Sequence, residues 1–264
     1  MPWAGVPDRS PHLHDVRMQR PPSVVLAVAL AAVAAAASAL TASSSSAVAT
    51  PPPTRWVTQV GTYDYLLQPD YTGLLPLRDV VGNATLGLGT FDHLDGELVL
   101  MGGTVYRVGT DGTPKPADPG TTTPFFEAVK FAPQATMTLP AGTACSALQP
   151  YVDQLAGTSD GMVALRLTGT FTALTARSVP RQEQPYLPLA DVVATQTVFP
   201  LDGSRATLVG FRTGTNLKGV GAPGVHIHGL TTDRGAGGHI LSCTTGADVR
   251  MSIQVTRGAR VYGS

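Results

Sequence analysis

Cysteine and charge are both scarce in this sequence. Cys145 and Cys243 are the 2 cysteines among 264 residues, and they do not form a Cys-x-x-Cys pair. Isolated cysteines are more often small buried side chains than redox groups, so we expect no thiol chemistry, although an oxidising compartment would allow a disulfide. Lys and Arg together number 18, as do Asp and Glu, and no basic run occurs. This balance excludes an electrostatic footprint for nucleic acid or an anionic membrane, so small molecules are the expected partners.

Long apolar runs are absent apart from one near the N-terminus. Residues 24–40 are rich in Val, Ala and Leu, arginines precede them, and an Ala-Val-Ala sequence follows just before Thr50. The pattern predicts a signal peptide over residues 1–49, with Met18 as an alternative start of translation. A membrane anchor is the competing interpretation, but a usual span needs roughly 20 strongly apolar residues. We therefore expect a secreted or periplasmic protein without a stable membrane anchor.

The rest of the chain is long enough for one large domain or for two closely packed ones. Residues 50–55 read as a proline-rich spacer, since proline stiffens the backbone and removes a hydrogen-bond donor. From residue 56 to residue 264, short β-like runs alternate with turns rich in Gly, Asp and Pro. The predicted strands are 57–67, 86–91, 97–101, 104–108, 125–131, 162–168, 171–175, 207–212, 225–230, 239–243 and 249–255.

Helical signals are fewer. Residues 145–156 carry apolar side chains at helical spacing, with Thr143 available as an N-terminal cap, and 75–81 and 187–193 each suit a turn or two. The sum predicts an α+β protein that is β-rich, with mixed or antiparallel sheets, a few short helices and two closely packed subdomains. A repeating βαβ array is not expected.

Three histidines close to one another carry the strongest chemical signal. His226 and His228 are two residues apart, so on a strand they point to the same face, and a return strand can bring His239 beside them. Three neutral imidazoles with an open position are typical of a catalytic zinc or a related divalent metal. By contrast, His93 stands alone and is expected to be structural or merely polar.

Two other segments place charged residues near strand ends. Glu97 opens an apolar strand after the turn Asp95-Gly96, where a carboxylate is either simply solvated or part of a site. Arg177 ends an apolar strand pair, where a guanidinium can bind a substrate carboxylate through a bidentate pair of hydrogen bonds. A surface ion pair between Arg177 and Glu183 is the alternative.

Taken together, these segments resemble the alpha-acetolactate decarboxylase family. The resemblance rests on Gly-Thr-Phe at 89–91 with His-Leu-Asp-Gly-Glu at 93–97, Arg-Ser-Val-Pro-Arg-Gln-Glu-Gln-Pro-Tyr at 177–186, and Gly-Val-His-Ile-His at 224–228 with Gly-Gly-His at 237–239. These motifs occur in the same order in the family, and the similarity runs from about residue 61 to residue 243. Three ordered motifs are far more specific than any one of them.

The resemblance implies a zinc-dependent conversion of 2-acetolactate to acetoin and CO2, and a homodimer. It implies that zinc is held by His226, His228 and His239, with Glu97 at the metal, and that Arg177 handles the substrate and the delivery of a proton. The remaining residues that it brings to the substrate pocket are Thr90, Leu94 and Val179.

One departure from the family pattern keeps other functions open. The family usually supplies a further glutamate to the metal from a C-terminal tail, and this sequence has no Asp or Glu after Asp248. An exported metal-binding protein, or a diverged metalloenzyme of the same fold with lost or altered activity, is therefore the alternative. A metal oxygenase of the cupin kind also begins from His-x-His, but it usually needs a glutamate shortly afterwards, and residues 229–232 offer none.

Overall fold

A computed structural model of the chain describes residues 55–263. The predicted signal peptide and all but the last residue of the predicted spacer lie outside the described residues. Within residues 55–263, none of the helices has the length and apolar character needed to cross a membrane.

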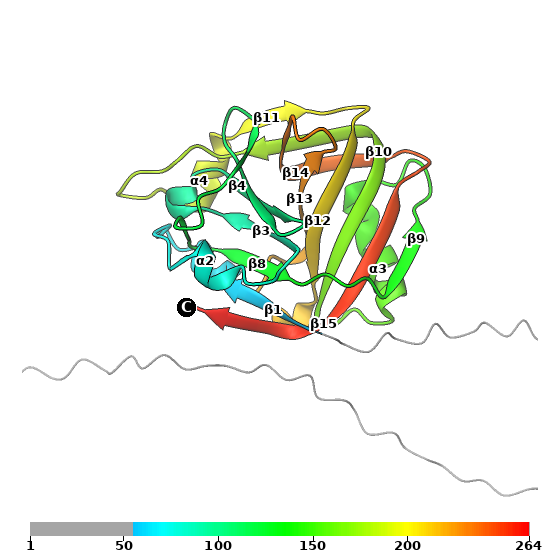
Figure 1. Cartoon of the computed structure of the whole chain (residues 1–264), viewed down its shortest axis with the longest axis horizontal. Coiled ribbons are helices and arrows are strands. Elements are labelled where there is room, and N and C mark those ends of the chain that lie inside the picture. The colour runs from blue at the N-terminus through cyan, green and yellow to red at the C-terminus, as the bar shows by residue number, and fades with distance from the viewer. Residues whose placement is uncertain (1–54, 264) are drawn as a thin grey trace, which may run out of the picture.

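The described chain consists mostly of strands (Figure 1). In chain order the strands are β1 (Arg55–Val60), β2 (Leu75–Pro76), β3 (Leu86–Thr90), β4 (Glu97–Met101), β5 (Thr104–Val108), β6 (Pro114–Pro116), β7 (Thr122–Thr123), β8 (Phe126–Val129), β9 (Ala135–Thr138), β10 (Met162–Ser178), β11 (Thr197–Pro200), β12 (Arg205–Thr213), β13 (Gly224–Thr231), β14 (Gly237–Thr245) and β15 (Arg250–Tyr262). The helices are α1 (Tyr63–Leu66), α2 (Leu77–Val80), α3 (Leu148–Ala156) and α4 (Leu189–Ala194), with 3₁₀ turns η1 (Asp92–Leu94), η2 (Cys145–Ala147) and η3 (Thr215–Leu217).

Thirteen of these strands belong to one sheet. The main path runs β12-β13-β14-β10-β15-β1-β8-β3-β4-β5-β6, with β11 paired to β10 and β9 to β15. The β1–β15 pair is parallel and the other strand pairs are antiparallel, so the sheet is mixed. This observation confirms the predicted β-rich α+β class.

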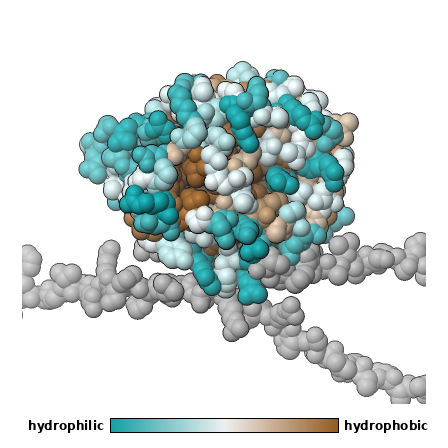
Figure 2. Space-filling view, viewed as in Figure 1, coloured by the Kyte–Doolittle hydropathy of each residue, from teal (hydrophilic) through white to brown (hydrophobic). Residues whose placement is uncertain are grey.

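The two ends of the sheet fold toward each other. Strand β4 contacts β13 and β14 without pairing with either, and β3 contacts β12. One apolar cluster fills the space between these halves, including Leu88, Phe125 and Phe211. A second cluster lies between β10, β15 and α3, which Figure 1 shows on the same side of the molecule. On the face seen in Figure 2, apolar surface gathers near the middle and polar surface surrounds it.

Several predicted elements have different bounds in the structure. Residues 57–67 were expected to be one strand, but the strand ends at Val60 and α1 begins at Tyr63, because the Thr62 side chain accepts a hydrogen bond from the Tyr65 amide and caps the helix. The predicted strands 162–168 and 171–175 are one strand, β10.

The predicted helix at 145–156 corresponds to η2 and α3, but the proposed cap was wrong. The Thr143 hydroxyl donates to the Pro140 carbonyl, and no side chain caps the start of α3. The two cysteines are also more than isolated buried residues, because Cys145 and Cys243 form a disulfide. The disulfide joins η2 to β14, the strand that carries His239.

Candidate metal site and active-site cavity

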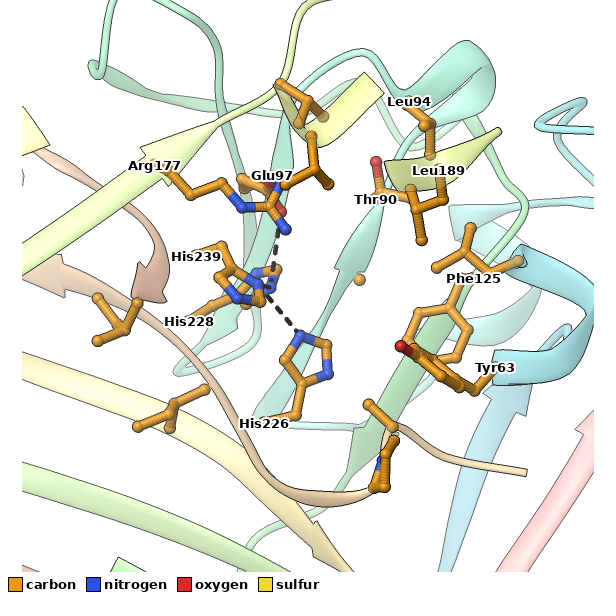
Figure 3. A pocket seen from close by; sticks show the side chains of 18 of the residues that line it. Tyr63, Thr90, Leu94, Glu97, Phe125, Arg177, Leu189, His226, His228 and His239 are labelled. Carbon is orange, nitrogen blue, oxygen red and sulfur yellow. Dashed lines mark hydrogen bonds and ion pairs between the residues drawn. The ribbon is translucent and has the colours of Figure 1, made fainter. Parts of the chain in front are cut away.

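Strands β13 and β14 bring the three histidines together. His228 lies directly opposite His239 in the antiparallel register, and His226 projects from the same face of β13 two residues earlier. The Nδ1 atom of His239 is 3.1 Å from Nε2 of His228 and 3.3 Å from Nε2 of His226. Figure 3 shows the three rings converging on one side of a cavity.

This arrangement fits a metal ion better than it fits direct hydrogen bonding. At a metal–nitrogen distance of about 2.0 Å, two ligands in a tetrahedral arrangement lie about 3.3 Å apart, close to the separations seen here. One imidazole nitrogen carries either a proton or a lone pair, so Nδ1 of His239 cannot satisfy both neighbours. The group His226, His228 and His239 could therefore hold a metal ion.

The surroundings of the histidines favour their neutral, metal-binding form. Burial lowers the pKa of His226 to about 3 and the pKa values of His228 and His239 well below their usual range, with the nearby Arg177 guanidinium adding to the effect. Nδ1 of His228 is 2.8 Å from the Leu98 carbonyl, to which it can donate. That hydrogen bond fixes the tautomer with a lone pair on Nε2, the atom that faces the other two rings.

A buried ion pair lies next to the histidines. Arg177 donates from Nη1 to Oε1 of Glu97 over 2.6 Å, and Oε2 of Glu97 is 3.6 Å from Nε2 of His228. Glu97 is 4% exposed, so it is not the solvated carboxylate of the simpler interpretation. Burial raises the pKa of Glu97, and the Arg177 guanidinium opposes this shift.

The pairing of β10 with β14 places Arg177 at the site. Arg177 pairs directly with His239, which brings the guanidinium to the histidine side of the cavity. Gly238, just before His239, has φ of 136°, and a Cβ atom there would lie 2.4 Å from the Arg177 carbonyl oxygen. Glycine at this position therefore permits the close approach of the two strands. Glu183, the other candidate partner, pairs with Arg181 instead.

The cavity between the two halves of the sheet has a volume of about 350 Å³. Thr90, Leu94 and Val179 all line it, together with Glu97, Arg177 and the three histidines. The Thr90 hydroxyl donates to the carbonyl of Gly96, which lies in the connection between β3 and β4. This hydrogen bond holds the threonine side chain in place.

His93 does not line the cavity. Its Nδ1 lies 2.6 Å from the Tyr186 hydroxyl, and its backbone amide donates to the Tyr71 carbonyl. These contacts join η1 to the segment before α4, in agreement with the expected structural role of His93.

Sequence reasoning missed two aromatic residues of the cavity, Tyr63 and Phe125. Tyr63 fell inside a segment predicted as a strand, and its position became apparent only when α1 was seen to begin there. The signal that could have identified it is Thr62, a favourable N-cap residue directly before it.

Three imidazoles converge beside a buried Glu–Arg pair in a β-rich α+β fold. These features define a candidate metalloenzyme. Residues 57–262 match the family described as "Alpha-acetolactate decarboxylase". The chain belongs to this family, which confirms the resemblance seen in the sequence. The prediction of an enzyme that is a decarboxylase, a carbon–carbon lyase, is confirmed at the level of the family.

Curated relatives carry the same description. An alpha-acetolactate decarboxylase of Methanosarcina mazei is 42% identical over 183 residues, which is 69% of this chain and 64% of that protein. One from Klebsiella aerogenes is 35% identical over 72% of this chain and 73% of that protein. The chain thus spans somewhat less than two thirds of the Methanosarcina relative.

The fold is also similar to that of a solved relative. The crystal structure of alpha-acetolactate decarboxylase from Bacillus subtilis strain 168 superposes with a TM-score of 0.74 at 30% identity, covering 78% of this chain and 88% of that chain. The strand-rich arrangement described above is therefore that of the family.

Proposed function

We propose that this protein catalyses the zinc-dependent decarboxylation of 2-acetolactate to acetoin and CO2. The observation that carries the proposal is the meeting of three imidazoles and the Glu97–Arg177 pair on one wall of one cavity. Simple metal storage needs the imidazoles but has no use for a buried guanidinium beside them. Membership of the family supports the choice of substrate.

In this proposal His226, His228 and His239 hold the zinc ion, and Glu97 lies at its edge. Their neutral imidazole nitrogens are the ligand type that zinc accepts, and a site with three protein ligands leaves a position open for substrate. Bound zinc would supply Lewis acidity that polarises the ketone of the substrate.

Arg177 and Glu97 would handle charge and protons. When the bond to the carboxylate breaks, CO2 leaves and the electron pair moves toward the ketone oxygen, where negative charge develops. The Arg177 guanidinium would pair with the substrate carboxylate or with that developing charge. Glu97 would orient a water molecule or relay the proton that the product must gain, a role that suits a carboxyl group whose pKa is raised by burial.

The test is acetoin formation from racemic acetolactate by protein purified from Thr50 onward, with the metal content determined on the same sample. Activity that disappears with a chelator and returns with zinc is the expected result. Bound metal without acetoin would contradict the proposal and favour a metal-binding protein or a diverged enzyme.

We also propose that the protein is exported after cleavage near Ala49 and acts as a homodimer. The disulfide between Cys145 and Cys243 supports export, because disulfides persist mainly in oxidising compartments. N-terminal sequencing of protein recovered outside the cytoplasm would give Thr50 first, and light scattering would give twice the mass of the chain. A protein that keeps residues 1–49, or a monomer, would contradict these two statements.

A further inference from the structure

Tyr63 stands across the cavity from the histidines. It is the first residue of α1, its backbone amide donates to the Val220 carbonyl over 2.8 Å, and Thr62 caps the helix. The side chain amide of Gln59 donates to the same Val220 carbonyl, which anchors this corner further. In Figure 3 the ring of Tyr63 lies beside Phe125, and its hydroxyl end points into the cavity toward the histidine side.

The Tyr63 hydroxyl is free to bind a ligand. Besides the three histidines, the polar side chains along the described cavity wall are Tyr63, Thr90, Glu97 and Arg177. Thr90 donates to the Gly96 carbonyl, and Arg177 donates to Glu97. Residues 55–263 offer no hydrogen-bond partner to the Tyr63 hydroxyl, and Tyr63 itself is only partly buried. A donor that faces a cavity without a protein partner is available to a substrate.

Much of the remaining cavity wall is apolar. Leu66, Phe125, Leu189 and Val193 contribute hydrocarbon to it, and Figure 3 shows Phe125 and Leu189 across from the histidines, as Tyr63 is. A 2-hydroxy-3-oxo acid has three oxygen functions, and when its hydroxyl and ketone face the histidines, its carboxylate must find partners elsewhere. Arg177 lies on the histidine side of the cavity, where it pairs with Glu97, so a carboxylate on the opposite side takes its hydrogen bond from another donor.

We propose that Tyr63 is a substrate-binding residue whose hydroxyl donates a hydrogen bond to the substrate carboxylate. This inference rests on the proposed function for the identity of the substrate. The hydrogen bond holds the carboxylate on the side of the cavity away from the histidines and so sets the direction in which CO2 departs. Tyr63 thereby selects for acids over neutral hydroxyketones.

The test compares Tyr63→Phe with wild type, using two ligands that differ in the carboxylate. One is 2-hydroxy-2-methylpropanoate, which keeps the carboxylate and the tertiary hydroxyl but has no ketone; the other is acetoin, which has no carboxylate. Zinc content and the dissociation constants of both ligands are measured by calorimetry on purified zinc-loaded protein, together with kcat and KM for acetolactate. The matched control is Tyr65→Phe, which removes a hydroxyl from the same helix outside the cavity.

Tyr63→Phe should keep its zinc, bind 2-hydroxy-2-methylpropanoate about 10-fold more weakly or worse, and bind acetoin as wild type does, because a hydrogen bond to a charged group is lost. Tyr65→Phe should match wild type in all assays. Equal weakening for both ligands, or none for the acid, would overturn the inference.

Failure of the proposed function gives a different result. In that case wild-type protein makes no acetoin. Selective weakening of the acid by Tyr63→Phe in such a protein would still support the carboxylate contact, whereas an active wild type with an unchanged Tyr63→Phe variant would refute the Tyr63 inference alone.

Discussion

Two buried glutamates of the same sheet have opposite surroundings. Glu97 on β4 contacts the Arg177 guanidinium at 2.6 Å and lies 3.6 Å from the His228 ring nitrogen. Glu127 on β8 is fully buried, and neither of its carboxyl oxygens has a hydrogen-bond partner among residues 55–263. Burial raises the pKa of Glu127 to about 8, with no charged neighbour to oppose the shift. Burial thus raises the pKa of both carboxyl groups, but only at Glu97 does a neighbouring guanidinium oppose the shift.

The position of Glu127 suits a neutral side chain. Gln59 lies directly opposite on β1, and its side chain oxygen is also buried without a partner. An ionised Glu127 would be a buried charge without a hydrogen bond, which is costlier than a protonated carboxyl group. Glu127 does not line the cavity, so it has no direct access to substrate. We therefore expect the Glu97 region to control catalysis and the Glu127 region to control stability.

The largest effect is expected from removing a metal ligand in the Glu97 region. His226→Ala should release most of the zinc and lower kcat/KM for acetolactate by about 1000-fold or more, because the remaining pair of imidazoles leaves the metal site incomplete. Metal analysis after gel filtration and an acetoin assay measure the two effects. Stoichiometric zinc in this variant would contradict the assignment of the site.

The matched control is His93→Ala. His93 lies outside the cavity and is held by Tyr186, so this variant should keep its zinc. Equal metal loss in both variants would show that the effect reflects general unfolding rather than ligation.

A second substitution would make the two glutamates more alike. Arg177→Ala leaves Glu97 buried without its guanidinium, as Glu127 is, and we expect metal to be retained while kcat/KM falls by about 100-fold or more. The fall should come from weaker stabilisation of the negative charge that develops as CO2 leaves. Steady-state kinetics with metal analysis test this expectation; near wild-type turnover would make Arg177 a structural residue.

The sequence predicted the histidine site well because that site depends on local geometry. Residues two apart on a strand share a face, and a return strand places its own residues opposite, so the convergence of His226, His228 and His239 follows from short-range rules. The contact between Glu97 and Arg177 could not be read in this way, because 80 residues separate them and only the folding of the sheet brings β4 to β10. The family resemblance placed Glu97 and Arg177 at the site but did not indicate that they form an ion pair.

The errors in the predicted fold have local physical causes. The two predicted strands 162–168 and 171–175 leave residues 169–170 between them, although β10 is continuous there. In the structure a Cβ atom at Gly169 would lie 2.6 Å from the Val249 backbone, so glycine permits close packing within a continuous strand. Similarly, the apolar pattern of β1 was extended through Thr62, whose side chain ends the extended segment by capping α1. The close packing at Gly169 is not visible without knowing which backbone lies alongside, whereas the Thr62 cap is a local signal that the sequence does contain.

The smallest effect on catalysis, and the most specific test of the comparison, is expected from Glu127→Gln. The folded pKa of about 8 lies above the unfolded value near 4.5, so the proton on Glu127 stabilises the fold fully below about pH 4.5, and this stability is lost as pH rises through about 8. Glutamine has the same shape and cannot ionise. At pH 9 the variant should therefore exceed wild type in free energy of unfolding by on the order of 5 kcal/mol, since the two pKa values differ by about 3.5 and one pKa unit corresponds to about 1.4 kcal/mol. At pH 4 the two proteins should be equally stable, and zinc content and kcat should be unchanged at neutral pH.

Urea denaturation across this pH range measures the difference in the free energy of unfolding between the variant and wild type. If that difference were the same at every pH, Glu127 would have the same pKa in the folded and unfolded states. The contrast with Glu97 would then not arise from ionisation.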